Sequence, residues 1–238
     1  MINGLRVLGF VTARGGSKGL PGKNLRDLCG KPLIAWSIET ALRSETIDEL
    51  VVSTDSQEIA DVSRRYGAEV PFLRPSALAT DTATSIAVVA HAIDWLRAAG
   101  REYDILVLIE PTSPLRETHD VDAAVRQMID AQAGAIVSVC RADATHPAFI
   151  YRKGAGERLT PYDIELATSP RRQDVEPMFF LEGTVYASKI GTLLERGTFC
   201  HEGTVGYEVP KWKSPEVDDI VDFLLIEAIM RHRGLGTS

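Results

Sequence analysis

The sequence predicts an α/β protein with a doubly wound, mostly parallel sheet, because short apolar runs alternate along the chain with longer segments of helical spacing. The runs that resemble buried strands are Val7 to Thr12, Leu50 to Thr54, Ile105 to Ile109 and Ala135 to Val139. The segments with helical spacing are Pro32 to Ser44, Gln57 to Tyr66, Thr84 to Ala99 and Asp120 to Ala131. We therefore expect crossover helices over a Rossmann-like sheet, with ligands at the carboxyl ends of its strands.

The alternation stops after about Thr145. Residues 146 to 180 carry prolines, glycines and charges without a sustained period, which indicates an arm or small lobe. Regular patterns return with strands at Gly183 to Ser188 and Thr204 to Pro210, followed by an amphipathic helix at Asp219 to Arg231. One domain covering residues 1 to 238, with the arm inserted in it, is the simplest organisation.

Composition excludes several classes of protein. The chain has 238 residues, of which 45% are hydrophobic and 25% charged, and this is enough to build a core. The net charge of −7 disfavours a nucleic-acid partner, and the absence of a long apolar run disfavours a membrane partner. The start of the chain resembles no signal peptide, so we expect a cytoplasmic protein. The three cysteines are widely separated and indicate neither a disulfide framework nor a zinc site.

The first predicted strand leads into a loop that is rich in glycine and cations. Its sequence is Ala13-Arg14-Gly15-Gly16-Ser17-Lys18-Gly19-Leu20-Pro21-Gly22-Lys23-Asn24. Glycines allow backbone N–H groups to approach phosphate oxygens, and the cations neutralise the remaining charge. The spacing fits neither a P-loop nor a dinucleotide-binding fingerprint. A mobile surface loop has a similar composition, but the position at the end of a strand favours phosphate binding.

This loop, followed by Gly30-Lys31-Pro32-Leu33, resembles the signature of the acylneuraminate cytidylyltransferases, also called CMP-sialic acid synthetases. The resemblance extends over nearly the whole chain. Its further landmarks are Ser53-Thr54-Asp55, the segment Arg74 to Ser85, Pro111-Thr112-Ser113-Pro114-Leu115-Arg116 and Arg171-Arg172-Gln173-Asp174. Such a family member has a nucleotidyltransferase fold and transfers CMP from CTP to the C2 hydroxyl of a nonulosonic sugar acid, releasing pyrophosphate.

The resemblance implies roles for particular residues. The catalytic set would be Arg14, Lys18, Lys23 and Asp218. The nucleotide would be bound by Ala13, Arg14, Gly15, Gly16, Ser17, Asn24, Arg74 and Ser85. The sugar would be bound by Glu110, Thr112, Ser113, Arg171, Arg172, Gln173, Phe180 and Glu182. The residues alone leave open that Arg74 is a surface arginine, that Ser85 only begins a helix and that the Arg171 pair is solvated.

The acidic segment near the end of the chain resembles the metal-binding segment of the family. Glu216 and Asp218 alternate in an extended stretch, so both carboxylates would face one side and share a Mg²⁺ ion with phosphate oxygens. An acidic helix start is the alternative, and Asp219 and Asp222 suit that role. The family also implies a homodimer, with Arg171 or Arg172 of the arm completing the sugar site of the second copy.

Three positions depart from the pattern of enzymes specific for sialic acid. Glu110 replaces a glutamine, Phe180 replaces an arginine and Glu182 replaces an asparagine. A carboxylate in place of an amide loses hydrogen-bond donors and adds charge. These changes leave open an amine-bearing, dideoxy-diamino or non-acetylated relative of sialic acid. Other functions left open are an eight-carbon ketodeoxyoctulosonate cytidylyltransferase, a glycosyltransferase that uses a nucleotide sugar, and a non-catalytic nucleotide-binding module.

Overall fold

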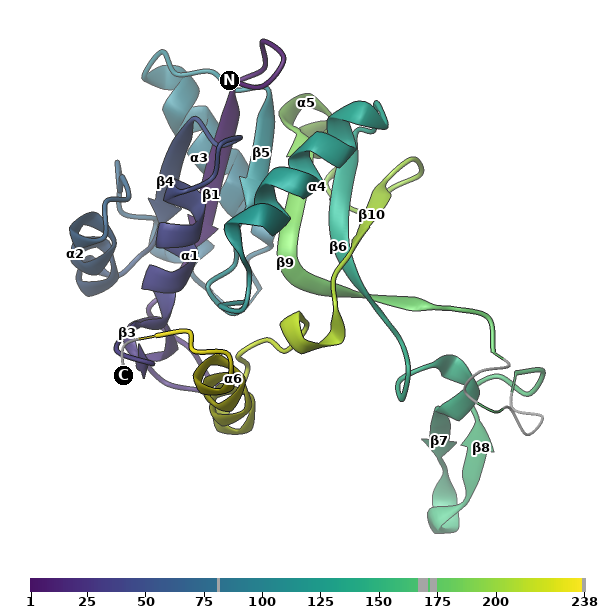
Figure 1. The fold of residues 1–238 in the computed structure, drawn as a ribbon. Coiled ribbons are helices and arrows are strands. Elements are labelled where there is room, and N and C mark those ends of the chain that lie inside the picture. The colour runs from purple at the N-terminus through teal and green to yellow at the C-terminus, as the bar shows by residue number, and fades with distance from the viewer. Residues whose placement is uncertain (81, 167–170, 172–174, 237–238) are drawn as a thin grey trace.

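The computed structural model describes residues 1–80, 82–166, 171 and 175–236. Its centre is a six-stranded sheet with helices packed on both faces (Figure 1). The strands of this sheet are β1 (Val7–Thr12), β4 (Glu49–Ser53), β5 (Ile105–Leu108), β6 (Ala135–Arg141), β9 (Phe179–Lys189) and β10 (Val205–Glu208). Short antiparallel pairs lie outside it, formed by β2 (Asp27–Leu28) with β3 (Lys31–Pro32) and by β7 (Tyr151–Lys153) with β8 (Leu159–Pro161). The predicted α/β class is confirmed.

Strand order explains where a ligand site forms. The order is β10-β6-β9-β5-β1-β4, and β1 pairs in parallel with both β4 and β5. The chain passes from β1 to β4 on one side and then returns to β5 on the other side of β1. This reversal opens a crevice beside the carboxyl end of β1. Strand β9 is antiparallel to β5 and β6. The beginning of β9 therefore lies at the same edge of the sheet as the ends of β5 and β6.

Helices cover the two faces of the sheet. They are α1 (Leu33–Leu42), α2 (Gln57–Arg65), α3 (Ser85–Ala98), α4 (Thr118–Asp130), α5 (Ile190–Arg196) and α6 (Ile220–His232), with 3₁₀ turns at Lys23–Leu25, Ser76–Leu78, Pro147–Phe149, Ala155–Glu157 and Lys211–Lys213. Helices α1, α2 and α4 pack on one face with Val7 and Val11 of β1. Helices α3 and α5 pack on the other face with Leu8 and Phe10. This alternation along β1 is what a strand buried on both faces requires.

Helix α6 belongs to a third apolar cluster that holds two distant segments together. Its residues Phe223 and Ile226 pack with Leu20 of the glycine-rich loop and with Val217 of the acidic segment. The helix begins with a capping box in which the Asp219 side chain accepts from the backbone N–H groups of Val221 and Asp222. The cluster thus places the acidic segment beside the loop, although nearly 200 residues separate them in the sequence.

The predicted arm projects from the body of the molecule between β6 and β9 and contains the β7–β8 pair (Figure 1). At its base, His146 is almost fully buried, and its Nε2 lies 3.0 Å from the Glu176 carbonyl oxygen, while Nδ1 accepts from Ala148 N–H. The strand predicted at 183–188 is longer, because β9 already begins at Phe179 within the predicted arm. The other predicted elements are found with ends that differ by one or two residues, which is the usual uncertainty of helix and strand boundaries. Within the described residues, no helix combines the length and the apolar composition that a bilayer crossing needs.

Candidate active site

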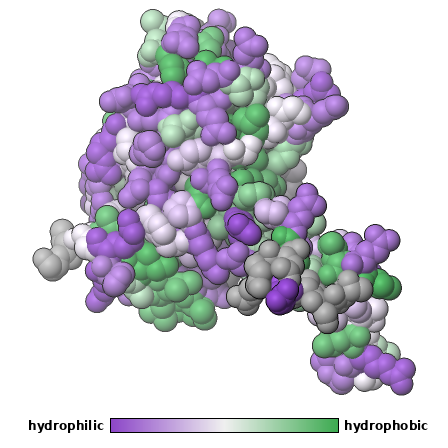
Figure 2. Space-filling model, turned by 45° about the vertical axis from the view of Figure 1, so that its right-hand side comes forward, coloured by the Kyte–Doolittle hydropathy of each residue, from purple (hydrophilic) through white to green (hydrophobic). Residues whose placement is uncertain are grey.

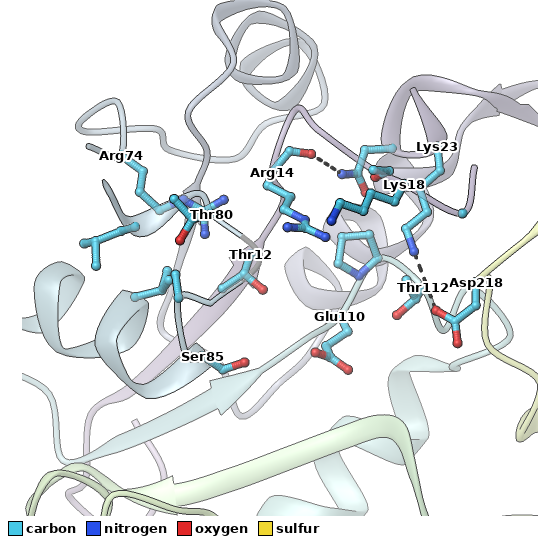
Figure 3. A pocket seen from close by; sticks show the side chains of 17 residues that line it. Thr12, Arg14, Lys18, Lys23, Arg74, Thr80, Ser85, Glu110, Thr112 and Asp218 are labelled. Atoms are coloured by element: carbon cyan, nitrogen blue, oxygen red, sulfur yellow. Dashed lines mark hydrogen bonds and ion pairs between the residues drawn. The ribbon is translucent and has the colours of Figure 1, made fainter. Parts of the chain in front are cut away.

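A cleft of about 410 Å³ opens at the carboxyl ends of the central strands. Ten of the residues expected to form the site line it: Arg14, Ser17, Lys18, Lys23, Asn24, Arg74, Ser85, Glu110, Thr112 and Asp218. The cleft also has lining residues that the sequence did not predict: Thr12, Gly19, Leu78, Thr80, Ala83, Val88 and Pro111. Figure 3 shows the cationic ends of Arg14 and Lys18 pointing into the middle of the cleft, with Arg74 at one end and Asp218 at the other.

The glycine-rich loop is fixed by contacts from three directions. The Gly15 N–H donates to Asp55 Oδ1 at 2.9 Å, and Asn24 Nδ2 donates to the Arg14 carbonyl at 3.0 Å. Gly19 passes so close to the acidic segment that a Cβ there would lie 2.4 Å from the Asp218 carbonyl oxygen. A side chain at position 19 would push the two segments apart. This glycine is therefore needed for a close approach of two backbones rather than for flexibility.

Lys23 joins the loop to the acidic segment. Its Nζ donates to the Val217 carbonyl at 2.7 Å and lies 3.8 Å from Asp218 Oδ1. Burial lowers the pKa of Lys23, and the neighbouring carboxylates of Asp218 and Glu110 partly oppose this shift. Asp218 itself remains exposed, with 86% of its side chain accessible. The lysine thus holds the backbone of the segment in place while the Asp218 carboxylate stays open to the cleft.

Arg74 occupies the other end of the cleft and is not a surface arginine. Only 7% of it is exposed, its Nη2 lies 3.7 Å from Asp55 Oδ1, and its buried Nε has no hydrogen-bond partner within the described chain. Burial lowers the pKa of Arg74, against the attraction of Asp55. Ser85 is the first residue of α3, where the preceding Thr84 caps the helix, and it also faces the cleft. Ser85 therefore begins the helix and lines the cleft, and its contact with a nucleotide stays a prediction.

Asp55 connects the two halves of this arrangement, because one of its oxygens contacts both Gly15 and Arg74. If the cleft binds CTP, as the sequence resemblance implies, Asp55→Ala should raise the KM for CTP about tenfold, the effect of losing a hydrogen bond to a charged acceptor. Asp55→Asn should have a smaller effect, since an amide oxygen still accepts from the Gly15 N–H. Steady-state kinetics with varied CTP measure this, with Asp61→Asn on the exposed face of α2 as the control. An unchanged KM in Asp55→Ala would remove Asp55 from nucleotide binding.

The remaining acidic residues meet around Gly183, just beside the cleft. A Cβ on Gly183 would lie 2.6 Å from Ser113 Oγ and 3.0 Å from both Glu110 Oε2 and Glu216 Oε2. The Gly183 N–H donates to Glu216 Oε1 at 2.6 Å. Burial, reinforced by Glu110, raises the pKa of Glu216 to about 7. Burial also raises the pKa of Glu110 and of Glu182. This end of the site holds an excess of negative charge.

Arg116 supports the region beside the cleft, and the sequence analysis quoted it in a motif but did not interpret it. The guanidinium is fully enclosed and donates to the carbonyls of Glu110, Gly183 and Thr184. It therefore joins the end of β5 to the antiparallel strand β9. Burial lowers its pKa to about 10. No sequence signal distinguishes an arginine that binds carbonyls from one that binds a ligand.

Part of the predicted set lies away from the cleft. Six predicted residues are not among those that line the cleft: Ala13, Gly15, Gly16, Ser113, Glu182 and Glu216. Phe180 is 38% exposed on the outer part of β9, and Arg171 is exposed in the arm. Arg172 and Gln173 lie outside the described residues. Among the described residues, no group of three or more His, Cys, Asp or Glu side chains is arranged to hold a metal ion, so Glu216 and Asp218 are at most a two-residue set.

Comparison with known proteins agrees with this geometry. Residues 8–153, which include the glycine-rich loop, Arg74 and Glu110, match the family model described as cytidylyltransferase. The chain belongs to the cytidylyltransferase family. Its members are nucleotidyltransferases, so the protein is an enzyme of this class.

Relatives extend the family match to the rest of the chain, and a solved structure shows the same fold. A CMP-N,N'-diacetyllegionaminic acid synthase of Legionella pneumophila is 34% identical over 95% of this chain and 97% of its own length. An N-acylneuraminate cytidylyltransferase of Escherichia coli is 31% identical over 96% of this chain, which spans 53% of that protein. In fold, the chain is similar to a CMP:2-keto-3-deoxy-manno-octonic acid synthetase complexed with CTP, with a TM-score of 0.71, 18% identity and coverage of 96% and 99% of the two chains.

Proposed function

We propose that this enzyme transfers CMP from CTP to the C2 hydroxyl of a nonulosonic sugar acid and releases pyrophosphate. The observation that carries the proposal is the cleft, where Arg14, Lys18 and Lys23 concentrate positive charge in an acidic protein. Relatives named for legionaminic, pseudaminic and acylneuraminic acids support the nine-carbon class of acceptor. The family match favours this reaction over a glycosyltransferase. The likeness to the octonic acid synthetase is one of fold and gives the eight-carbon acceptor no further support.

CTP fits the cleft in one direction. Its triphosphate would lie against the loop, whose cations Arg14 and Lys18 point into the middle of the cleft (Figure 3). The cytidine would lie between Arg74 and Ser85, where Leu78 and Val88 provide an apolar surface for the base. The buried Arg74 Nε would gain a hydrogen-bond acceptor from the nucleoside. The sugar acid then occupies the end near Glu110 and Thr112.

Positioning and charge stabilisation account for most of the catalysis that these residues supply. The cations of the loop stabilise the charge that develops on the leaving pyrophosphate. Lys23 fixes the backbone before Asp218, and Arg116 fixes the floor beneath Glu110. Each of these groups is held before the substrate arrives, so little reorganisation is needed in the transition state.

The donor set fits Mg²⁺ shared with the nucleotide. Glu216 and Asp218 offer hard oxygen ligands, and Glu216 lies beside the Glu110 carboxylate, so a divalent cation there would offset neighbouring negative charges. Mg²⁺ commonly uses one or two carboxylates together with substrate phosphates, so two protein ligands suffice. When bound, the ion would offset the negative charge of the phosphates. Asp218 is the more exposed of the two carboxylates, and Glu216 is anchored by the Gly183 N–H.

The direct test is pyrophosphate release from CTP and Mg²⁺ with a panel of eight- and nine-carbon keto-deoxy sugar acids, with a reaction lacking sugar as the control. Release that depends on one nine-carbon acid is the expected result. Pyrophosphate release only with the eight-carbon acid would show that the acceptor is an eight-carbon and not a nine-carbon sugar acid. Absence of release across the panel, with CTP still binding, would contradict the proposal and favour a nucleotide-binding module.

A second copy of the chain is proposed as the partner of the arm. Large apolar side chains are exposed there: Ile150, Tyr151, Leu159, Tyr162, Ile164, Phe179, Phe180 and Leu181. Figure 2 shows apolar atoms on the arm at the right and another apolar patch at the lower left, where α6 exposes Ile220, Val221, Leu224 and Leu225. The arm and the exposed face of α6 are apolar surfaces on the same side of the molecule (Figure 2). In a twofold dimer, the second copy of the chain would cover both of them.

We expect Ile164→Asp to convert the dimer into a monomer, because Ile164 is 72% exposed and would place a charge within the apolar interface. Size-exclusion chromatography with light scattering gives the mass. Leu42→Asp is the matched control, since Leu42 is 48% exposed at the end of α1 in the body of the molecule. A wild-type protein that is already monomeric at working concentration would refute the dimer.

A further inference from the structure

Oxygen atoms converge at the sugar end of the cleft without enough hydrogen donors to satisfy them. Glu110 Oε2, Glu216 Oε2 and Ser113 Oγ all lie within 3.0 Å of one point, the position of a Cβ on Gly183. Glycine is the residue that leaves this space open, because any side chain at position 183 would collide with all three oxygens. The antiparallel strand β9 brings Gly183 here, opposite the end of β5.

The donors near this point are already used, except for the Ser113 hydroxyl, whose single hydrogen can satisfy only one of the carboxylate oxygens. The Gly183 N–H binds Glu216, and the N–H and Oγ1 of Thr184 bind Glu182 Oε2. Arg116 directs its donors to main-chain carbonyls and to Ser37 Oγ. The buried cation therefore forms no ion pair with the carboxylates within the described part of the chain.

Several acceptors are consequently left without partners. Within the described residues, Ser113 Oγ and Glu182 Oε1 have no hydrogen bond, although Ser113 is fully buried and Glu182 is 1% exposed. The Glu110 carboxylate likewise takes part in no hydrogen bond or ion pair there, and unlike the other two it lines the cleft. A native structure seldom leaves buried polar groups unsatisfied unless a ligand or water completes them.

Glu110 differs from the two carboxylates proposed for the metal. Glu216 is anchored to Gly183 and Asp218 lies near Lys23, so both belong to the acidic segment. Glu110 comes from the end of β5, on the floor of the cleft, and Figure 3 shows its carboxylate directed away from the loop cations. When a sugar covers the cleft it removes water from Glu110. A desolvated carboxylate is costly unless the ligand supplies a donor, and a cationic donor compensates it best.

We propose that Glu110 determines specificity by accepting from a cationic nitrogen substituent, an amine or amidine, on the sugar acid. The proposal rests on the cytidylyltransferase function and names the class of its acceptor. A carboxylate accepts but cannot donate, so an acyl carbonyl placed against Glu110 would oppose two acceptors. Glutamine at this position would offer donors as well and remove the requirement for a cation.

The test compares kcat/KM for pairs of nine-carbon keto-deoxy acids that differ in one nitrogen substituent, a free amine against an acetamide. Wild-type enzyme should prefer the amine for one position of the nitrogen by about 10- to 100-fold, the range of a charge-assisted hydrogen bond. Glu110→Gln should reduce or reverse this preference. Glu58→Gln, at the start of α2, is the matched control and should keep the wild-type ratio.

The outcomes separate this inference from the proposed function. Turnover of nonulosonic acids without preference for an amine, or an unchanged ratio in Glu110→Gln, would overturn the role of Glu110 and leave cytidylyl transfer standing. Absence of pyrophosphate release with every acid would overturn both. If the variant does not fold, thermal shifts of wild-type protein with each acid of a pair supply the comparison, and equal shifts would refute the proposal.

Discussion

Lys23→Ala is expected to lower kcat about 100- to 1,000-fold, which is the usual cost of removing one preorganised charge from a transition state. In the proposed reaction, Lys23 would stabilise charge on the leaving oxygens, and that charge would grow as the reaction proceeds. Its Nζ also binds the Val217 carbonyl, so its loss would loosen the segment that carries Asp218. KM for CTP should change less than kcat. Steady-state kinetics with saturating sugar acid separate the two constants.

The control for this variant is Lys211→Ala. Lys211 is 74% exposed and lies 3.6 Å from Asp143, so it carries the same charge in a solvated position. It should retain wild-type kcat and KM. If Lys23→Ala raised KM alone and left turnover intact, Lys23 would be a binding residue without a part in the chemical step.

The largest effect on stability is expected from Lys213→Met. Lys213 Nζ lies 2.6 Å from both Asp120 Oδ2 and Glu117 Oε2, and Lys213 and Asp120 are only 4% and 2% exposed. Removing the cation leaves the Asp120 carboxylate buried without its partner, which costs about 3–5 kcal/mol of folding free energy. Tyr207 also donates to Asp120 at 3.1 Å, but one hydroxyl cannot replace the charge. Urea unfolding measures the difference.

The double variant Lys213→Met with Asp120→Asn tests the cause. The amide removes the buried charge and still accepts from the Glu117 N–H, which caps α4. We expect the double variant to be more stable than Lys213→Met alone, which is the signature of a coupled pair. Equal or additive losses would show that the lysine contributes by packing rather than by its charge.

Many residues of this cleft can be predicted from the sequence, because the proposed phosphate-binding residues are neighbours along the chain. The glycines and cations of such a loop lie in one continuous segment. The segment directly follows a strand, because ligands bind at the carboxyl ends of the strands in this type of sheet. The loop from Arg14 to Asn24 satisfies both conditions, and ten of the expected residues line one cleft. The positions of strands and helices can also be predicted from the sequence, because the spacing of apolar residues within a short segment indicates its secondary structure.

Other features arise only when distant segments meet. Strand β9 runs antiparallel, and this direction brings Gly183 and Glu182 to the edge of the sheet where Glu110 follows the end of β5. Asp55 contacts Gly15 and Arg74 together, and Lys213 neutralises Asp120 from 93 residues away. Hydrogen bonds of this kind leave no periodic trace in the sequence.

The sequence by itself determined the fold class, the glycine-rich loop that lines the cleft and the family, since each depends on residues that are neighbours along the chain. Tertiary structure decided the partners of the buried charges. Arg116 shows the reason. Its guanidinium binds main-chain carbonyls of β9, and because every residue has a carbonyl, the amino-acid sequence does not mark which ones accept these bonds. Within the described residues, the same fold leaves the Glu110 carboxylate at the cleft without a hydrogen bond, because the Gly183 N–H and the Arg116 guanidinium are engaged elsewhere.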